Sequence, residues 1–154
     1  MTRSIRLAAR ALIMIDGRVL LVNAFPGEGP NLWCAPGGGC EVGEAIPDTL
    51  TREVHEELGL KITIGAFAGV SEFQSAATGF HQVDLFFHAA ANSALPSDWT
   101  DPEGVVHTHC LADRAMLMGL PHKPHNLAEM AFDGIQADYF GFHRMVERSS
   151  LGGA

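Results

Sequence analysis

Three consecutive glycines and a glutamate-rich helical segment fill residues 37–60, which read GGGCEVGEAIPDTLTREVHEELGL. An apolar residue recurs at every fourth position, and this spacing predicts a helix over 46–58 that buries one stripe. Pro47 suits the first turn of such a helix, and Gly59 suits the left-handed residue that ends it. The stripe consists of Ile46, Leu50, Val54 and Leu58. The rest of the chain must therefore supply a surface against which this helix packs.

The glutamates of this helix stand on one edge, beside the buried stripe. Glu53 and Glu57 are four positions apart and Glu53 and Glu56 are three apart, so their side chains project from neighbouring turns. Like charges at these spacings destabilise a helix by roughly a few tenths of a kcal/mol per pair. A site for a hard cation would explain the arrangement, because carboxylates supply both oxygen ligands and negative charge. The alternative is a solvated acidic helix that binds nothing.

The rest of the chain mixes expected strands and helices without regular alternation. An Asp16-Gly17 turn joins the first two strands, and a small-residue turn joins two long strands further on. The expected strands cover 4–15, 18–23, 61–74, 80–91 and 105–112, and further helical segments cover 113–119 and 125–133. Residues 138–147 fit a strand and a helix equally well. This order predicts the α/β class, as an α/β/α sandwich with a mixed β-sheet.

Composition narrows the classes of partner. The chain has 154 residues, which predicts a single domain over 1–154, and its formal net charge is −8. Proteins that bind nucleic acids or anionic membranes generally carry basic surfaces, so we expect neither partner. Three cysteines argue against a disulfide framework and suit a reducing, cytoplasmic compartment. No apolar run reaches the roughly 18 residues that a membrane span needs.

Residues 38–60 resemble the signature of the Nudix hydrolase family. That signature is Gly, five residues, Glu, seven residues, then Arg-Glu-aliphatic-any-Glu-Glu-any-Gly-aliphatic, and every fixed position is filled here. The matching residues are Gly38, Glu44, Arg52, Glu53, Val54, Glu56, Glu57, Gly59 and Leu60. The resemblance implies a Nudix-like fold. It also implies hydrolysis of a nucleoside diphosphate linked to a group X, by water attack on phosphorus with divalent metal bound, usually Mg²⁺, with Mn²⁺ as a substitute.

The match to the signature implies roles for individual residues. The expected metal ligands are Glu53, Glu56 and Glu57, with Glu57 first among them. A backbone carbonyl of Gly38, or of the glycine before it, is a further candidate ligand. Arg52 is expected to serve catalysis by orienting a glutamate, and Glu44 to help either through a water molecule or by fixing the loop before the helix. Bound cations would offset the crowded charge and let a chain of net charge −8 hold a polyphosphate.

The general base is expected to be a glutamate of the signature, such as Glu53 or Glu57, or a carboxylate from a distant loop. The segment SDWTDPEGVV (97–106) supplies Glu103, which we choose because small family members commonly have an acid near this place. A solvated acidic loop is the alternative. Further candidates are Asp98, Asp101, Glu72 and Asp84.

Aromatic and basic residues are candidates for contacts with the substrate. Phe25 and Trp99 lie in expected loops and could stack on a nucleobase, whereas Phe86 lies in an apolar strand and is expected in the core. Arg10, and Arg18 less directly, could meet phosphate. We therefore expect substrate contacts from Phe25, Trp99 and Arg10.

The identity of X stays open at this stage. The region after the signature, SEFQSAATGF, carries neither the tyrosine nor the proline that mark some other Nudix subfamilies. A nucleoside triphosphate pyrophosphohydrolase is therefore the leading hypothesis, with ADP-ribose or a nucleotide sugar as alternative substrates. A non-catalytic nucleotide-binding module is a different class of hypothesis, which the intact signature disfavours. Homodimerisation is possible for so small a chain.

The histidine-rich segment 107–125 carries four histidines and Cys110. A transition-metal site there is conceivable, but the spacing matches no zinc motif. Surface and partly buried histidines are the expected alternative.

Overall fold

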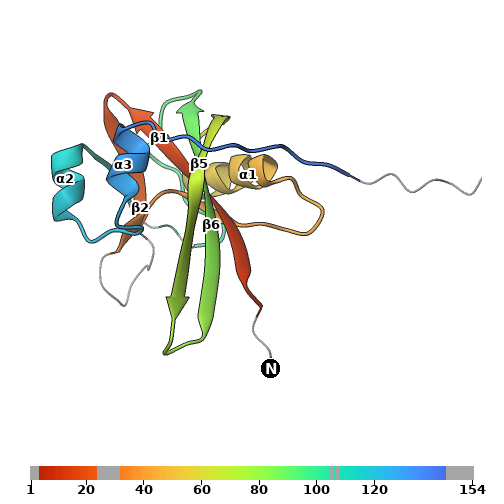
Figure 1. Ribbon diagram of the computed structural model, residues 1–154. Coiled ribbons are helices and arrows are strands. Elements are labelled where there is room, and N and C mark those ends of the chain that lie inside the picture. Colours follow the sequence, from red (N-terminus) through yellow and green to blue (C-terminus); the bar gives the residue numbers. More distant parts are fainter. Residues whose placement is uncertain (1–3, 24–31, 105, 107, 145–154) are drawn as a thin grey trace, which may run out of the picture.

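The computed structural model describes residues 4–23, 32–104, 106 and 108–144. Strands and helices follow one another in mixed order along the chain (Figure 1). The strands are β1 (Arg6–Ile15), β2 (Arg18–Asn23), β3 (Trp33–Cys34), β4 (Gly37–Gly39), β5 (Ile62–Ser75), β6 (Phe80–Ala91) and β7 (His109–Ala112). The helices are α1 (Ile46–Leu58), α2 (Arg114–Gly119) and α3 (Leu127–Phe132). Among the described residues, no helix has the length and apolar character that crossing a membrane requires.

Within the described residues, seven strands form one mixed sheet, in which β3, β2, β1, β6 and β5 lie side by side in that order. β1 pairs in parallel with β6, whereas its pairings with β2 and β4 are antiparallel. β7 extends the sheet beyond β2. The parallel pairing places Arg6 opposite Gln82, and Arg10 opposite Phe86. Residues near the start of the chain thus lie beside the β5–β6 hairpin.

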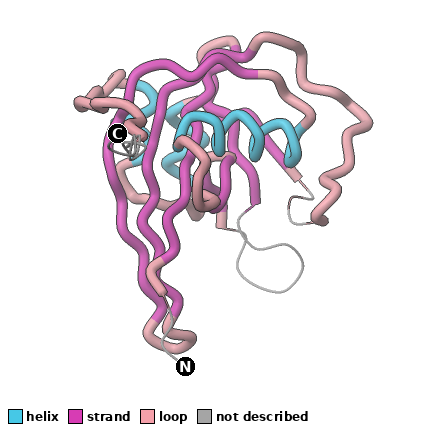
Figure 2. Tube along the Cα trace, turned by 90° about the vertical axis from the view of Figure 1, so that its right-hand side faces the viewer, coloured by secondary structure: helices cyan, strands magenta, loops and turns pink. Residues whose placement is uncertain are grey.

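The helices cover both faces of this sheet. α1 packs on one face, and α2 and α3 pack on the other (Figures 1 and 2). Neighbouring residues of a strand point to opposite faces. Leu20 and Phe87 accordingly join the core under α1, while Leu21 and Phe86 join the core under α2 and α3. These layers confirm the α/β/α sandwich with a mixed sheet.

The structure corrects the expected extent of one strand. Residues 105–112 were expected to form a single strand, but the strand begins at His109 and ends at Ala112, where it pairs with β2. Val106 and Thr108 precede it in irregular structure, while residues 105 and 107 lie outside the described residues. The shorter strand follows from the length of its partner, because β2 offers few positions for pairing.

The segment after α3 is neither a strand nor a helix over residues 138–144. It is held by tertiary contacts instead. The N–H of Ala137 donates to the carbonyl of Phe67 over 2.7 Å, and the ring of Tyr139 packs against the rings of Phe67 and Phe87. This segment crosses the sheet in front of β5 and β6 and continues past α1 (Figure 1).

Candidate active site

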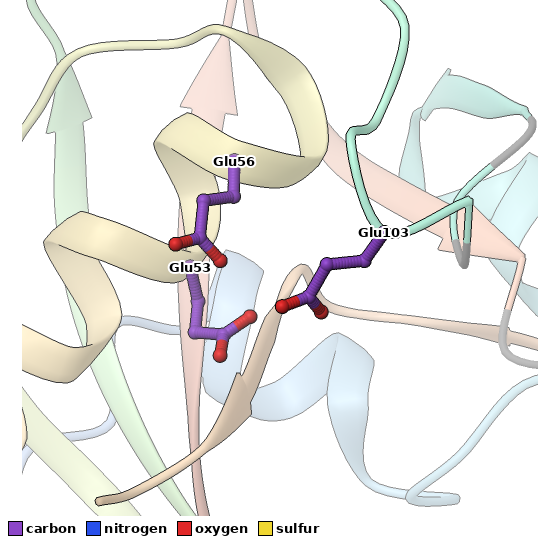
Figure 3. A group of neighbouring side chains, drawn as sticks. All are labelled: Glu53, Glu56 and Glu103. Carbon is purple, nitrogen blue, oxygen red and sulfur yellow. The ribbon is translucent and has the colours of Figure 1, made fainter.

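Three carboxylates from two distant segments meet beside α1. Glu53 and Glu56 project from the helix, and Glu103 reaches them from the loop that follows β6 (Figure 3). One oxygen of each carboxylate lies within 4.8 Å of the others. The sequence predicted Glu53 and Glu56 as metal ligands and Glu103 as the base, and the structure brings all three together. Their roles stay predictions.

Glu57 lies deeper than these three carboxylates. Its side chain is buried at 9% exposure, and its Oε2 accepts the backbone N–H of Gly37 over 3.2 Å. Burial raises the pKa of this carboxyl group to about 8, against the opposing attraction of Arg10. Without a cation, burial therefore favours the protonated form of Glu57, and binding a cation there would displace the proton.

The glycines before α1 allow a carboxylate to lie directly against the backbone. A Cβ atom at position 38 would lie 2.4 Å from Oε2 of Glu53, so any side chain there would displace this carboxylate. Gly37 has a φ of 150°, and a Cβ there would meet the carbonyl of Ala9 at 1.9 Å. Burial also raises the pKa of Glu53. The backbone at Gly37 and Gly38 thus lies in direct contact with the carboxylates of Glu57 and Glu53.

Arg52 ties the loop before α1 to the helix. Its Nε and Nη2 donate to the two oxygens of Glu44, each over 2.9 Å, and its Nη1 donates to Glu53 over 3.0 Å. Hydrogen bonds from Arg52 and from Thr49 lower the pKa of Glu44 to about 2. Both oxygens of Glu44 are engaged by these donors, so Glu44 acts in the structure as a brace. Arg52 orients Glu53, and its part in catalysis stays a prediction.

The loop that carries Glu103 is anchored at two points. The indole of Trp99 donates to the carbonyl of Glu56 over 2.9 Å and lies across Gly59, at the end of α1. Asp101 is 5% exposed, and its carboxylate accepts the backbone N–H groups of Glu103 and Val106, each over 2.9 Å. These contacts place Glu103 at the helix. The indole N–H of Trp99 is thereby occupied. The sequence predicted that this side chain would stack on a base.

A cavity of about 450 Å³ has Arg10 in its wall. It is lined by residues of β1, β5, β6 and the segment before α3, among them Arg10, Phe73, Asp84, Lys123 and Asn126. Arg10 Nε pairs with Asp84 over 3.0 Å, while its Nη1 donates to the carbonyl of Gly37 over 3.4 Å. Arg10 therefore connects the wall of the cavity to the glycine that holds Glu57.

The structure places Arg10 differently from the sequence expectation. We expected an arginine open to phosphate, but its side chain is 12% exposed and is committed to Asp84 and to backbone carbonyls. Its remaining surface lines the cavity. Arg18, the lesser candidate, is exposed at the start of β2. Phe25 falls outside the described residues.

Two weaker candidates for the base lie away from the carboxylates. Glu72 accepts a hydrogen bond from His81 on the β5–β6 hairpin, and Asp84 pairs with Arg10. Sequence reasoning missed the importance of Asp84 and Lys123 for the cavity. A lone aspartate inside the apolar run VDLFF was the signal for Asp84, since such a charge needs a buried partner.

The described residues contain one group of three or more potential ligands, formed by Glu53, Glu56 and Glu103. The histidine-rich segment contributes no such group there, and His107 lies outside the described residues. Three carboxylates at this separation, next to the glycine backbone, suit a hard divalent cation such as Mg²⁺ or Mn²⁺. The donor set therefore fits the metal that the sequence predicted.

Known proteins share both the sequence and the fold. A family model described as the NUDIX domain matches residues 5–127. A Mus musculus protein named nucleoside diphosphate-linked moiety X motif 6 is 25% identical over 91% of this chain and 50% of its own length. An Escherichia coli protein named nucleoside triphosphatase NudI is 32% identical over 62% of this chain and 82% of its own. The chain thus spans about half the length of the mouse relative.

Two solved structures have the same fold. A NUDIX hydrolase from Nitrosomonas europaea aligns with a TM-score of 0.73 at 20% identity, over 89% of this chain and 98% of that one. A MutT NUDIX hydrolase from Burkholderia pseudomallei aligns with a TM-score of 0.66 at 25% identity, over 85% and 98%. The family model covers most of the chain, and its signature residues meet in one carboxylate site. The chain therefore belongs to the Nudix family.

Proposed function

We propose that this Nudix protein is a pyrophosphohydrolase that converts a nucleoside triphosphate to a nucleoside monophosphate and pyrophosphate, with Mg²⁺ or Mn²⁺ bound. Family membership supports cleavage of a pyrophosphate linkage in a nucleoside derivative. The name of the Escherichia coli relative, a nucleoside triphosphatase, supports the triphosphate as substrate. ADP-ribose and nucleotide sugars are the competing substrates.

One observation carries the proposal. Glu53, Glu56 and Glu103 lie within 4.8 Å of one another, and Arg10 connects Gly37, which holds the neighbouring Glu57, to a cavity of about 450 Å³. Carboxylates so close repel one another unless cations lie between them. A polyphosphate at these cations would extend its nucleoside past Arg10 into this cavity. The arrangement thus accommodates both ends of a nucleotide.

The chain's own residues have distinct tasks in this scheme. Glu53, Glu56 and Glu57 hold the cation, which neutralises phosphate charge and polarises phosphoryl oxygens when bound. Glu103 accepts the proton of the attacking water, whose oxygen bonds to phosphorus as the bond to the leaving pyrophosphate breaks. Arg52 and Glu44 keep Glu53 and the preceding loop in place. Phe25 remains a proposed contact for the base, whereas Trp99 does not line the cavity into which this scheme places the base.

The test is a turnover screen with purified protein and Mg²⁺. Substrates would be nucleoside triphosphates, ADP-ribose, nucleotide sugars and dinucleoside polyphosphates, with products identified by phosphorus NMR. We expect turnover of triphosphates to monophosphate and pyrophosphate. Glu53→Gln should lower kcat at least a hundredfold, whereas Glu129→Gln, the same change on an exposed face of α3, should leave it unchanged.

Other outcomes would revise the proposal. Turnover of ADP-ribose or a nucleotide sugar alone would keep the hydrolase and replace its substrate. Nucleotide binding without turnover, with Mn²⁺ as well as Mg²⁺, would show a non-catalytic binding module. If the products are a nucleoside diphosphate and orthophosphate, water attacks the terminal phosphorus.

A further inference from the structure

One carboxylate on the wall of the cavity is nearly buried and held in a fixed orientation. Asp84 is 5% exposed. Arg10 Nε and Gln82 Nε2 both donate to its Oδ1, over 3.0 Å and 2.8 Å. Among the described residues, no hydrogen bond reaches its other oxygen, Oδ2. Asp84 lines the cavity, so Oδ2 is the oxygen left to accept a donor from a molecule bound there.

The orientation of Gln82 is determined by its other neighbour. Arg6 hydrogen-bonds the Oε1 atom of Gln82, and an arginine can only donate. The amide oxygen must therefore face Arg6, which leaves the amide nitrogen to face Asp84. Gln82 is 1% exposed, so this arrangement is shielded from water. Two fixed donors thus hold Oδ1 of Asp84, from β1 and from β6 itself.

Asp84 lies at the end of the site that is remote from the carboxylate cluster. Arg10 stands between them, because its guanidinium contacts Asp84 on one side and the carbonyl of Gly37 on the other. Gly37 in turn donates its N–H to Glu57. The proposed function places the phosphates at the cation on the carboxylate cluster, so the part of a nucleotide that meets Asp84 is its nucleoside.

We propose that Asp84 selects nucleobases that carry an exocyclic amino group, by accepting one amino N–H at Oδ2. This inference rests on the proposed function, which places the nucleoside in the cavity. A single free oxygen suits one donor, whereas the paired donors of guanine would need both oxygens. Phe73 lines the same cavity and offers an apolar surface to the ring.

The isosteric variant Asp84→Asn makes a sharp prediction. Arg10 and Gln82 both present donors, so the amide oxygen of the asparagine must take the place of Oδ1. Its amide nitrogen then takes the place of Oδ2 and offers a donor to the cavity. The variant should therefore prefer a base with an oxo group where the wild type prefers an amino group.

The experiment measures binding of nucleoside monophosphates by calorimetry, together with turnover of the matching triphosphates. CMP against UMP, and AMP against IMP, compare an amino group with an oxo group on the same ring. We expect the wild type to bind the amino member roughly ten- to a hundredfold more tightly, as for a hydrogen bond to a charged group. N4,N4-dimethyl-CMP should lose this advantage, and Asp84→Asn should reverse the preference.

The matched control is Asp133→Asn. Asp133 also pairs with an arginine, Arg114, but on the surface at the end of α3. This variant should keep both the affinity and the base preference. Because the wild-type comparison needs no variant, the inference can be tested even if Asp84→Asn folds poorly.

The outcomes separate this inference from the proposed function. Turnover with equal affinity for amino and oxo bases would overturn the role of Asp84 and leave the hydrolase standing. An amino preference in binding without turnover would overturn the hydrolase and keep the role of Asp84. A change in the preference for CMP over dCMP in Asp84→Asn, with the base preference unaltered, would assign the contact to the sugar and overturn the base assignment.

Discussion

Glu57 illustrates how burial prepares a carboxylate for a cation. Glu57 is 9% exposed, and one of its carboxylate oxygens already accepts the N–H of Gly37. Folding brings this side chain into contact with an apolar interior, which disfavours its charged form. The charged form of Glu57 therefore lowers the stability of the folded chain, and a bound cation would offset this loss. The cost of ionising Glu57 is measurable as a dependence of the free energy of unfolding on pH.

The metal-free protein should lose stability as the pH rises. The pKa of Glu57 is about 8 in the folded chain against 4.5 in the unfolded chain, so the folded form binds more protons between these values. This contribution is complete below about pH 4.5 and is lost toward pH 8, by about 3–5 kcal/mol at most. Urea unfolding in EDTA, compared with Glu57→Gln, would measure it. An equal slope in both proteins would contradict the burial argument.

Gly38 should tolerate no side chain if Glu53 is to keep its position. The Cβ of Gly38→Ala would lie 2.4 Å from Oε2 of Glu53, so the carboxylate must swing away. Because the end of a flexible side chain can move, we expect the fold to survive and the affinity for Mn²⁺ to fall at least tenfold. Calorimetric titration with Mn²⁺ would show this. Gly119→Ala, where a Cβ meets nothing within 4 Å, is the matched control and should bind Mn²⁺ as the wild type does.

α1 and the loop that follows β6 act as one unit, because Trp99 fastens the loop to the end of the helix. Trp99→Phe keeps a ring against Gly59 but removes the hydrogen bond to the carbonyl of Glu56. We expect a loss of about 1 kcal/mol in stability and a larger fall in kcat than in affinity, because Glu103 is less well placed. Thermal unfolding and steady-state kinetics would separate the two effects. A fall in affinity with kcat unchanged would instead favour contact between Trp99 and the base.

The helix was predictable from sequence to the residue, and the reason is local. Four-residue spacing, Pro47 and Gly59 all lie within or beside α1, and Gly59 has the left-handed φ of 65° that its position requires. β7 was not predictable in length, because its ends depend on pairing with β2. The path of 138–144 depends on Tyr139 packing against rings from β5 and β6, which no local pattern reports.

The carboxylate site was largely predictable, whereas the cavity was not. Glu53, Glu56 and Glu57 are neighbours in sequence and belong to a long signature, so their proximity follows from one helix. Arg10 and Asp84 are far apart in sequence and meet because β1 pairs in parallel with β6, while Lys123 reaches the cavity from the segment before α3. Sequence spacing carries no information about such a pairing.

Divalent cations should stabilise the whole fold if the carboxylate group binds them. A ligand that binds only the folded state adds about 2.7 kcal/mol at a concentration one hundred times its Kd. For a chain of this size, that corresponds to a rise in Tm of about 5–11 °C. Thermal unfolding with MgCl₂ against NaCl of equal ionic strength would show it. An equal rise in Glu53→Gln would place the cation elsewhere.

The pairing between β1 and β6 has a consequence for how the chain is made. β1 emerges from the ribosome some seventy residues before its partner β6, as the register of Arg6 with Gln82 shows. β1 therefore remains unpaired on the β6 side, with apolar residues exposed, until the β5–β6 hairpin has been synthesised. Nascent chains that end before β6 should therefore engage chaperones, and longer chains that include the hairpin should be released from them.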